Sequence, residues 1–237
     1  MKKRYTLMND HPSGAYYGQK LAAERLLRCY ELATPRVRRY LEAEVAFLRG
    51  LIPPRGTVLE LGCGYGRVLR AIGHDGRRIV GVDTAVGSLE MGVGYTAGVP
   101  GCALVAADAS VLPFGDGLFD SVVCVQNGMS AFGVDRPGLV REAMRVAVTD
   151  GRAIFSSYSE RFWDDRLEWF CIQSAHGLVG EIDEAQTGDG VIVCRDGFRA
   201  ETIGAGEFEA IGRELGLETT ITECDASSLF CVYRNLC

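Results

Sequence analysis

The most informative segment of the sequence is Val58-Leu59-Glu60-Leu61-Gly62-Cys63-Gly64-Tyr65-Gly66-Arg67. It predicts a buried strand that breaks into a glycine-rich turn and then opens a helix. Glycines at every second position allow positive φ and let the backbone approach a ligand closely, while the helix offers unpaired N–H groups and the positive end of its dipole. We therefore expect a nucleotide-cofactor site at this turn.

Three more apolar segments predict strands, and polar side chains follow each of them. Residues 78–82 end on Asp83, residues 103–107 end on Asp108, and residues 119–125 run into Gln126. An acidic side chain at the tip of the second strand is where a Rossmann-type fold places an acceptor for ribose hydroxyls. Either aspartate alone reads equally well as a solvated carboxylate at a strand end. Their joint placement after successive strands favours a site.

These marks together resemble the class I S-adenosylmethionine-dependent methyltransferases, of the small-molecule type 11/25. The resemblance rests on the G-x-G-x-G spacing, the acidic Glu60 within the strand, and the carboxylates at the second and third strands. The resemblance is strong over residues 56–160, whereas the flanking segments resemble the family only in their general architecture. It implies one α/β domain over residues 1–237, a Rossmann-like three-layer α/β/α sandwich around a seven-stranded, mostly parallel sheet with the last strand antiparallel.

The resemblance also implies the cofactor, S-adenosylmethionine, with S-adenosylhomocysteine as product. The resemblance implies that the cofactor is bound by residues in and directly after the core strands. These are Glu60, Gly62, Gly64, Gly66, Asp83, Thr84, Asp108, Ala109 and Gln126. Asp83 is expected to clamp the ribose and to contribute little to the stability of the ligand-free protein. Gln126-Asn127-Gly128-Met129 departs from the Asn/Asp-Pro-Pro-Tyr of DNA and protein-amine methyltransferases, which favours a small-molecule acceptor.

Residues 1–50 predict two helices, from Gln19 to Glu31 and from Thr34-Pro35 to Gly50. In related methyltransferases such a segment is a lid over the cofactor cleft. Tyr16, Tyr17 and Lys20 are therefore candidates to close over the substrate or the methionine end. The alternative is that the tyrosines only anchor an amphipathic segment to the core and that the lysine ammonium is simply solvated.

Beyond the fourth strand the pattern predicts a helix from Arg136, a fifth strand over residues 153–158, and an aromatic helix face over residues 162–170. Residues 161–205 are expected to be a substrate-cap insertion with an antiparallel β excursion. Residues 206–237 predict a helix and a β-hairpin that complete the sheet.

Methyl transfer from a sulfonium is an in-line displacement, so proximity supplies much of the rate and little acid–base catalysis is needed for N or S acceptors. The candidate catalytic residues are Asn127, His176 and Tyr17, and no metal site is expected. One alternative is a thiol or arsenite-type enzyme that uses Cys171, Cys194 and Cys224. Another is a cofactor-binding protein without turnover. An NAD-dependent oxidoreductase is disfavoured because its later third glycine is missing.

Composition excludes several classes of protein. A net charge of −6 argues against a nucleic-acid binder, whose phosphate contacts need a basic face. No segment approaches the ~20 apolar residues of a membrane span, and no signal peptide follows the basic first four residues. Nine cysteines without a C-x-x-C pair suggest a reducing compartment. We therefore expect a cytoplasmic enzyme, a monomer or homodimer, whose partner is a small-molecule acceptor.

Overall fold

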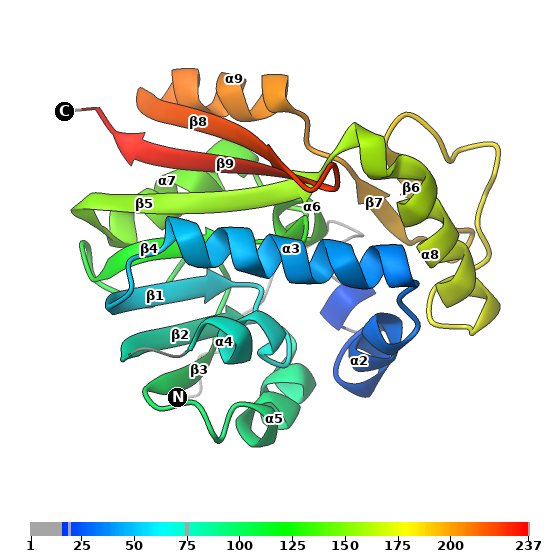
Figure 1. The fold of residues 1–237 in the computed structure, drawn as a ribbon, viewed down its shortest axis with the longest axis horizontal. Helices are drawn as coiled ribbons and strands as arrows, with labels where there is room; N and C mark the ends of the chain where they lie inside the picture. Colours follow the sequence, from blue (N-terminus) through cyan, green and yellow to red (C-terminus); the bar gives the residue numbers. More distant parts are fainter. Residues whose placement is uncertain (1–15, 19, 74–75, 237) are drawn as a thin grey trace, which may run out of the picture.

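The computed structural model describes residues 16–18, 20–73 and 76–236, and its centre is a seven-stranded sheet (Figure 1). The strands are β1 (Gly56–Leu61), β2 (Arg77–Asp83), β3 (Cys102–Ala106), β4 (Phe119–Cys124), β5 (Ala147–Tyr158), β8 (Leu217–Cys224) and β9 (Ser228–Asn235). Their order is β3-β2-β1-β4-β5-β9-β8. β1 to β5 pair in parallel, whereas β9 is antiparallel to both β5 and β8. The predicted sheet is confirmed, including its antiparallel last strand.

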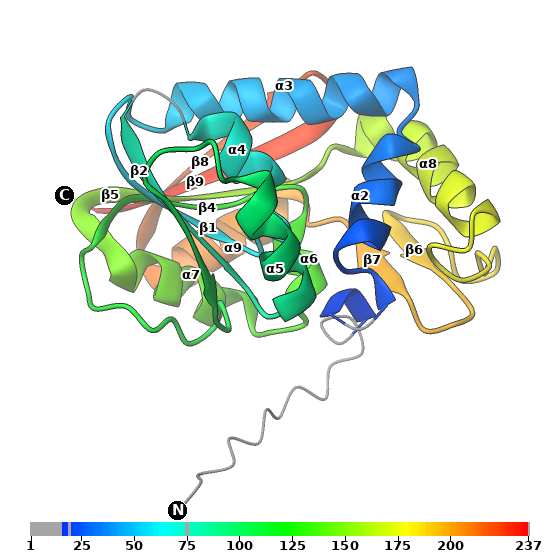
Figure 2. The same ribbon diagram turned by 90° about the horizontal axis from the view of Figure 1, so that it is seen from below.

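Helices cover both faces of the sheet and make three layers (Figures 1 and 2). On one face lie α3 (Pro35–Leu51), α4 (Arg67–Ile72) and α5 (Val86–Tyr95), and on the other lie α7 (Arg136–Val146) and α9 (Ala205–Leu215). Each face has its own buried cluster. Val58 packs with Leu48 of α3, and the next residue, Leu59, packs with Leu139 of α7. Consecutive strand residues thus point to opposite layers, as the pleat requires.

The topology changes direction at β1, which lies between β2 and β4. Open α/β sheets bind ligands beyond the carboxyl ends of the strands at such a switch point. The glycine turn follows β1 directly, so the fold places it at this position.

A cap lies beside the carboxyl ends of the strands (Figure 2). Its elements are α8 (Trp163–Ala175), the preceding 3₁₀ turn (Glu160–Phe162), and a two-stranded antiparallel sheet of β6 (Val191–Val193) and β7 (Arg199–Glu201). Arg166 of α8 ties them together, because its guanidinium donates to Ala200 O and Thr202 Oγ1. The predicted β excursion is confirmed, and the aromatic helix face is core, with Trp169 and Phe170 both buried.

The sequence analysis did not predict the helix α5 or the short helix α6 (Gly128–Phe132), which follows β4. The start of α3 was predicted correctly. Thr34 accepts a hydrogen bond from Val37 N at 3.3 Å, and Pro35 occupies the first helical position. The first N-terminal helix begins later than expected: α2 spans Glu24–Glu31, and Gln19 lies outside the described residues.

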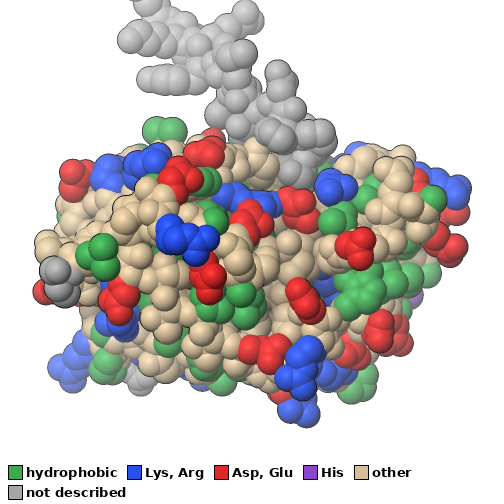
Figure 3. All heavy atoms as spheres, turned by 90° about the horizontal axis from the view of Figure 1, so that it is seen from above, with side chains coloured by type: hydrophobic (Ala, Val, Ile, Leu, Met, Phe, Trp, Pro, Cys, Tyr) green, Lys and Arg blue, Asp and Glu red, His purple; other side chains and the backbone are tan. Residues whose placement is uncertain are grey.

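Acidic and basic side chains intermingle on the face of the molecule drawn in Figure 3, consistent with 31 acidic and 25 basic residues in the chain. In the part of the chain that the structure describes, no helix has the length and apolar character needed to cross a membrane.

Candidate functional site

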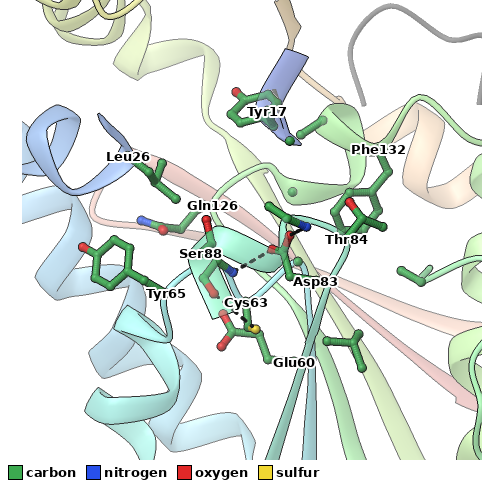
Figure 4. A pocket seen from close by; sticks show the side chains of 18 of the residues that line it. Tyr17, Leu26, Glu60, Cys63, Tyr65, Asp83, Thr84, Ser88, Gln126 and Phe132 are labelled. Carbon is green, nitrogen blue, oxygen red and sulfur yellow. Dashed lines mark hydrogen bonds between the residues drawn. The ribbon is translucent and has the colours of Figure 1, made fainter. Parts of the chain in front are cut away.

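A pocket of about 170 Å³ opens at the carboxyl ends of β1, β2 and β4 (Figure 4). Its walls come from four places: the glycine turn, the loops after β2 and β3, the turn into α6, and the N-terminal segment. In Figure 4 Tyr17 of that segment lies across the pocket from Glu60 of β1. The sequence-predicted residues that line it are Tyr17, Glu60, Gly62, Gly64, Asp83, Thr84, Asp108, Ala109 and Gln126.

The glycine turn needs its glycines. Gly62, Gly64 and Gly66 have φ of 69°, 54° and 85°, a region that other residues enter only with strain. A Cβ on Gly62 would lie 2.6 Å from the Phe132 ring, and one on Gly66 would lie 2.6 Å from Thr96 Cγ2. Gly66 also caps α4, so the backbone passes from the turn into a helix start beside the pocket. Of the three, Gly66 is the one that does not line the pocket itself.

Asp83 holds the glycine turn as well as facing the pocket. Its Oδ2 accepts from Gly64 N at 2.7 Å and its Oδ1 from Ala85 N at 2.8 Å. Burial raises the pKa of Asp83, and these backbone donors partly oppose the rise. Each carboxylate oxygen retains a lone pair for a ligand hydroxyl. The expectation that Asp83 leaves the ligand-free protein unaffected is therefore revised, because its carboxylate caps two backbone N–H groups without any ligand.

Asp108 and Ala109 line the pocket just after β3, and Thr84 lines it after β2. Asp108 Oδ1 accepts from both the backbone and the hydroxyl of Ser110, at 2.8 and 2.7 Å. This local turn fixes the Asp108 side chain beside the pocket.

Glu60 is the buried carboxylate of the site, with only 4% of its surface exposed. Burial raises its pKa to about 8, although the nearby Arg67 acts in the opposite direction. Its Oε2 is buried and has no hydrogen-bond partner among the described residues. A buried carboxylate oxygen without a donor is costly, so this atom is suited to a donor group on a ligand.

Arg67, directly after the third glycine, is a pocket residue that the sequence analysis missed. Its guanidinium stacks 5.0 Å from the centroid of the Tyr30 ring. Within the described residues it makes no hydrogen bond, and its Nε and Nη2 are buried. A sequence signal existed, because a cation in the first turn of a helix opposes the helix dipole and needs another reason to be there.

Gln126 lies at the end of β4, on the pocket side. Its Oε1 accepts from the Tyr30 hydroxyl at 2.9 Å, which joins α2 to the sheet. The pocket also has apolar and aromatic lining residues: Tyr17, Leu21, Leu26, Tyr30, Phe132 and Val134. In Figure 4 Leu26 lies near Gln126, whereas Phe132 lies beside Thr84.

Of residues 1–50, which were expected to form a lid, the structure describes residues 16–18 and 20–50. Tyr17, Leu21, Leu26 and Tyr30 line the pocket, whereas α3 lies along the sheet with Leu48 fully buried against it. An apolar stripe on a helix signals a buried face but does not say whether a sheet or a ligand cleft covers it.

Besides Gly66, four of the predicted site residues are not brought to the pocket. Asn127 is 5% exposed, and its amide is engaged by Ser130, Ser157 and the Glu201 carbonyl. His176 is exposed at the end of α8.

Tyr16 and Lys20 lie together on the far side of the N-terminal segment. Tyr16 donates to Asp196 Oδ2 at 2.6 Å, and Lys20 Nζ lies 3.5 Å from the same oxygen. They thus fasten the segment to the turn between β6 and β7, and their neighbour Tyr17 faces the pocket instead.

The cysteines of the arsenite alternative do not gather into a metal site. Cys171 is exposed, Cys194 is buried in the cap, and Cys224 ends β8. Among the described residues there is no group of three or more His, Cys, Asp or Glu side chains placed to hold a metal ion.

Comparison with known proteins gives a family match over the core. Residues 58–151 match the model of a family described as a methyltransferase domain. A demethylmenaquinone methyltransferase of Clavibacter sepedonicus is 34% identical over 116 residues, which are 48% of this chain and 46% of the relative. A 2-methyl-6-phytyl-1,4-hydroquinone methyltransferase of Synechocystis is 26% identical over 141 residues, 56% of this chain and 43% of the relative. The chain thus spans less than half the length of the curated relatives it matches.

Solved structures share the fold over nearly the whole chain. A protein of Pyrococcus horikoshii superposes with a TM-score of 0.66 at 20% identity, covering 94% of this chain and 98% of that one. A Thermotoga maritima protein, described as an S-adenosylmethionine-dependent methyltransferase and possible histamine N-methyltransferase, gives 0.66 at 15% identity, covering 94% and 100%. At these identities the likeness concerns the fold.

Proposed function

We propose that the chain is an S-adenosylmethionine-dependent methyltransferase with a small-molecule acceptor, since residues 58–151 match the model of a methyltransferase domain. One observation carries the proposal. Beside the glycine turn, the pocket presents the buried carboxylate of Glu60 and the half-buried guanidinium of Arg67. Each has buried hydrogen-bonding atoms without a partner among the described residues. A ligand that bears an ammonium and a carboxylate side by side matches both.

The methionine end of S-adenosylmethionine is such a zwitterion. Glu60 would accept from its ammonium and Arg67 would donate to its carboxylate. Asp83 and Thr84 are then placed for the ribose, and Asp108 and Ala109 for the adenine, because these pairs follow the next two strands of the sheet. A nicotinamide dinucleotide has no α-amino acid group, so it would leave Glu60 and Arg67 unmatched.

When bound, the cofactor supplies an electrophilic methyl group, and the chain's residues orient the acceptor and exclude water. Tyr17, Leu21, Leu26 and Tyr30 of the N-terminal segment give the pocket an apolar and aromatic wall. Such walls suit a flat, mostly apolar acceptor, as the substrates named for the two quinone-type relatives are. Catalysis would rest on proximity and orientation, with Tyr17 and Gln126 beside the acceptor. Asn127 and His176 have no part in this proposal, because neither lines the pocket.

Isothermal titration of the purified protein with S-adenosylmethionine, S-adenosylhomocysteine and NAD tests the cofactor. We expect micromolar binding of the two sulfur ligands and none of NAD. Arg67→Gln should weaken S-adenosylhomocysteine binding more than tenfold, whereas Arg70→Gln, an exposed arginine one turn along α4, should leave it unchanged. Failure of both sulfur ligands to bind the folded protein would reject the proposal.

Methyl acceptance is tested separately with labelled S-adenosylmethionine and a panel of hydroquinones, phenols, amines, thiols and arsenite. We expect label in a hydroquinone or phenol. Transfer to arsenite alone would favour the cysteine-based alternative, and binding without transfer to any acceptor would favour a protein that only binds the cofactor.

A further inference from the structure

The turn that connects β4 to α6 is strained. Gln126 and Asn127 have φ of 57° and 59°, so two consecutive residues other than glycine occupy the left-handed region. Side chains with a Cβ enter this region at a cost, and such conformations persist only where the surroundings hold them. The turn stands at the carboxyl end of β4, and Gln126 lines the pocket.

Asn127 is held by β5 and by the cap. Its Oδ1 accepts from the Ser157 hydroxyl at 2.7 Å, and its Nδ2 donates to the Glu201 carbonyl at 2.8 Å. These contacts anchor the second residue of the turn but leave the backbone of Gln126 to be held elsewhere.

The backbone of Gln126 is hydrogen-bonded to Glu44, a residue of α3. Glu44 is 1% exposed, on a helix whose other buried side chains are apolar or aromatic. Its Oε1 accepts from Gln126 N at 3.1 Å and from the Ser156 hydroxyl at 2.6 Å. Ser156 Oγ in turn accepts from Gln126 N at 2.9 Å. The three groups close a ring of hydrogen bonds beneath the strained residue.

We propose that Glu44 is a positioning residue of this site, which holds the strained Gln126 backbone and thereby keeps the acceptor end of the pocket in shape. Glu44 does not line the pocket and lies outside the matched methyltransferase segment. It acts through Gln126, whose side chain also receives the Tyr30 hydroxyl of α2, so the same turn links the core to the segment that covers the pocket. This assignment of a role at the pocket rests on the proposed function.

Two variants of Glu44 separate hydrogen bonding from charge. Glu44→Gln keeps an acceptor oxygen for Ser156 and Gln126, whereas Glu44→Leu removes it. We expect Glu44→Leu to weaken S-adenosylhomocysteine binding at least fivefold in titration and Glu44→Gln to stay within twofold of wild type. Glu42→Leu, on the exposed side of α3, is the matched control and should bind as wild type. Equal weakening by Leu and Gln, or no weakening by either, would overturn the proposal.

A double-mutant cycle tests whether Glu44 acts on the strained backbone. Gln126→Gly removes the strain, because glycine adopts positive φ freely. We expect the loss in Tm caused by Glu44→Leu to fall by at least half in the Gln126→Gly background. An equal loss in both backgrounds would mean that Glu44 only packs α3, and would overturn the proposal.

Ser156→Ala takes the place of Glu44→Leu in both measurements if the leucine variant does not fold. The same direction of change is expected, because the hydroxyl belongs to the same ring of hydrogen bonds. If wild-type protein binds no S-adenosylhomocysteine, the proposed function fails, and with it the role at the pocket. The cycle then still reports whether Glu44 holds the turn.

Discussion

Single residues in this protein often serve both the fold and the pocket. Asp83 is the clearest case, since one carboxylate caps the glycine turn and faces the ligand space. Glu60 is the opposite case, because its buried Oε2 has no hydrogen-bond partner among the described residues, which is costly without a ligand.

Asp83→Asn should therefore weaken both stability and binding. The amide puts a donor where the carboxylate accepts from a backbone N–H, which costs about 1–3 kcal/mol for a charged acceptor. For a chain of this size that corresponds to a fall in Tm of roughly 2–10 °C. Calorimetry without ligand checks it, and S-adenosylhomocysteine binding should drop more than tenfold. Asp150→Asn, an exposed carboxylate on β5, is the control. An unchanged ligand-free Tm would show that the capping bonds contribute nothing.

The raised pKa of Glu60, about 8, predicts opposite pH trends for stability and for binding. Above the ordinary value of 4.5 the unfolded chain has lost this proton while the folded protein keeps it, so Glu60 makes the ligand-free protein less stable as pH rises from 4.5 to 8. An ammonium ligand needs the ionised carboxylate, so its affinity should rise several-fold between pH 6 and 8.

Glu60→Gln should reduce both trends, and Glu90→Gln, exposed on α5, should leave them as in wild type. Thermal scans and titrations of S-adenosylhomocysteine across pH 5–8 provide the measurements. Identical pH profiles for wild type and Glu60→Gln would contradict the assignment.

At the scale of elements, the N-terminal segment depends on the cap. Tyr16 and Lys20 both bind Asp196, while Tyr17 and Leu21 of the same segment line the pocket. The contact that fastens the segment and the contact that covers the ligand therefore lie on opposite sides of one short stretch of chain.

Asp196→Ala should release this segment. We expect S-adenosylhomocysteine to dissociate three- to tenfold faster in stopped-flow measurements, because Tyr17 and Leu21 lose their fixed position over the pocket. Glu184→Ala, an exposed carboxylate nearby in the cap, should dissociate as wild type. Unchanged dissociation from Asp196→Ala would mean that the segment is held without this contact.

At the scale of the whole molecule, the pocket joins segments that are far apart in the chain. It is lined by the N-terminal segment, by the ends of β1, β2 and β4, and by α6. A ligand that touches all of these should stabilise the fold as a unit, since binding only to the native state adds RT ln(1 + [L]/Kd) to its stability.

S-adenosylhomocysteine at a hundred times its Kd should add about 2.7 kcal/mol and raise Tm by roughly 5–10 °C. Differential scanning fluorimetry with increasing ligand is the measurement, and NAD at equal concentration should give no shift. A rise with NAD equal to that with S-adenosylhomocysteine would contradict the cofactor assignment.

Local sequence patterns were sufficient to predict the sheet, the glycine turn and the polar positions around that turn. Gly62, Gly64, Asp83 and Asp108 could be placed because their positions relative to strand ends are local properties. The carboxyl ends of adjacent parallel strands then meet at one edge.

In contrast, contacts between distant segments determine which of two neighbouring side chains turns toward the pocket. Tyr16 binds Asp196, 180 residues away, and leaves the pocket to Tyr17. The Asn127 amide is hydrogen-bonded to Ser130, Ser157 and Glu201, while Gln126 faces the pocket. Glu44, 82 residues earlier in the chain, binds the backbone of that turn from α3. These outcomes depend on contacts between distant segments, and a local pattern of polar and apolar residues carries no record of them.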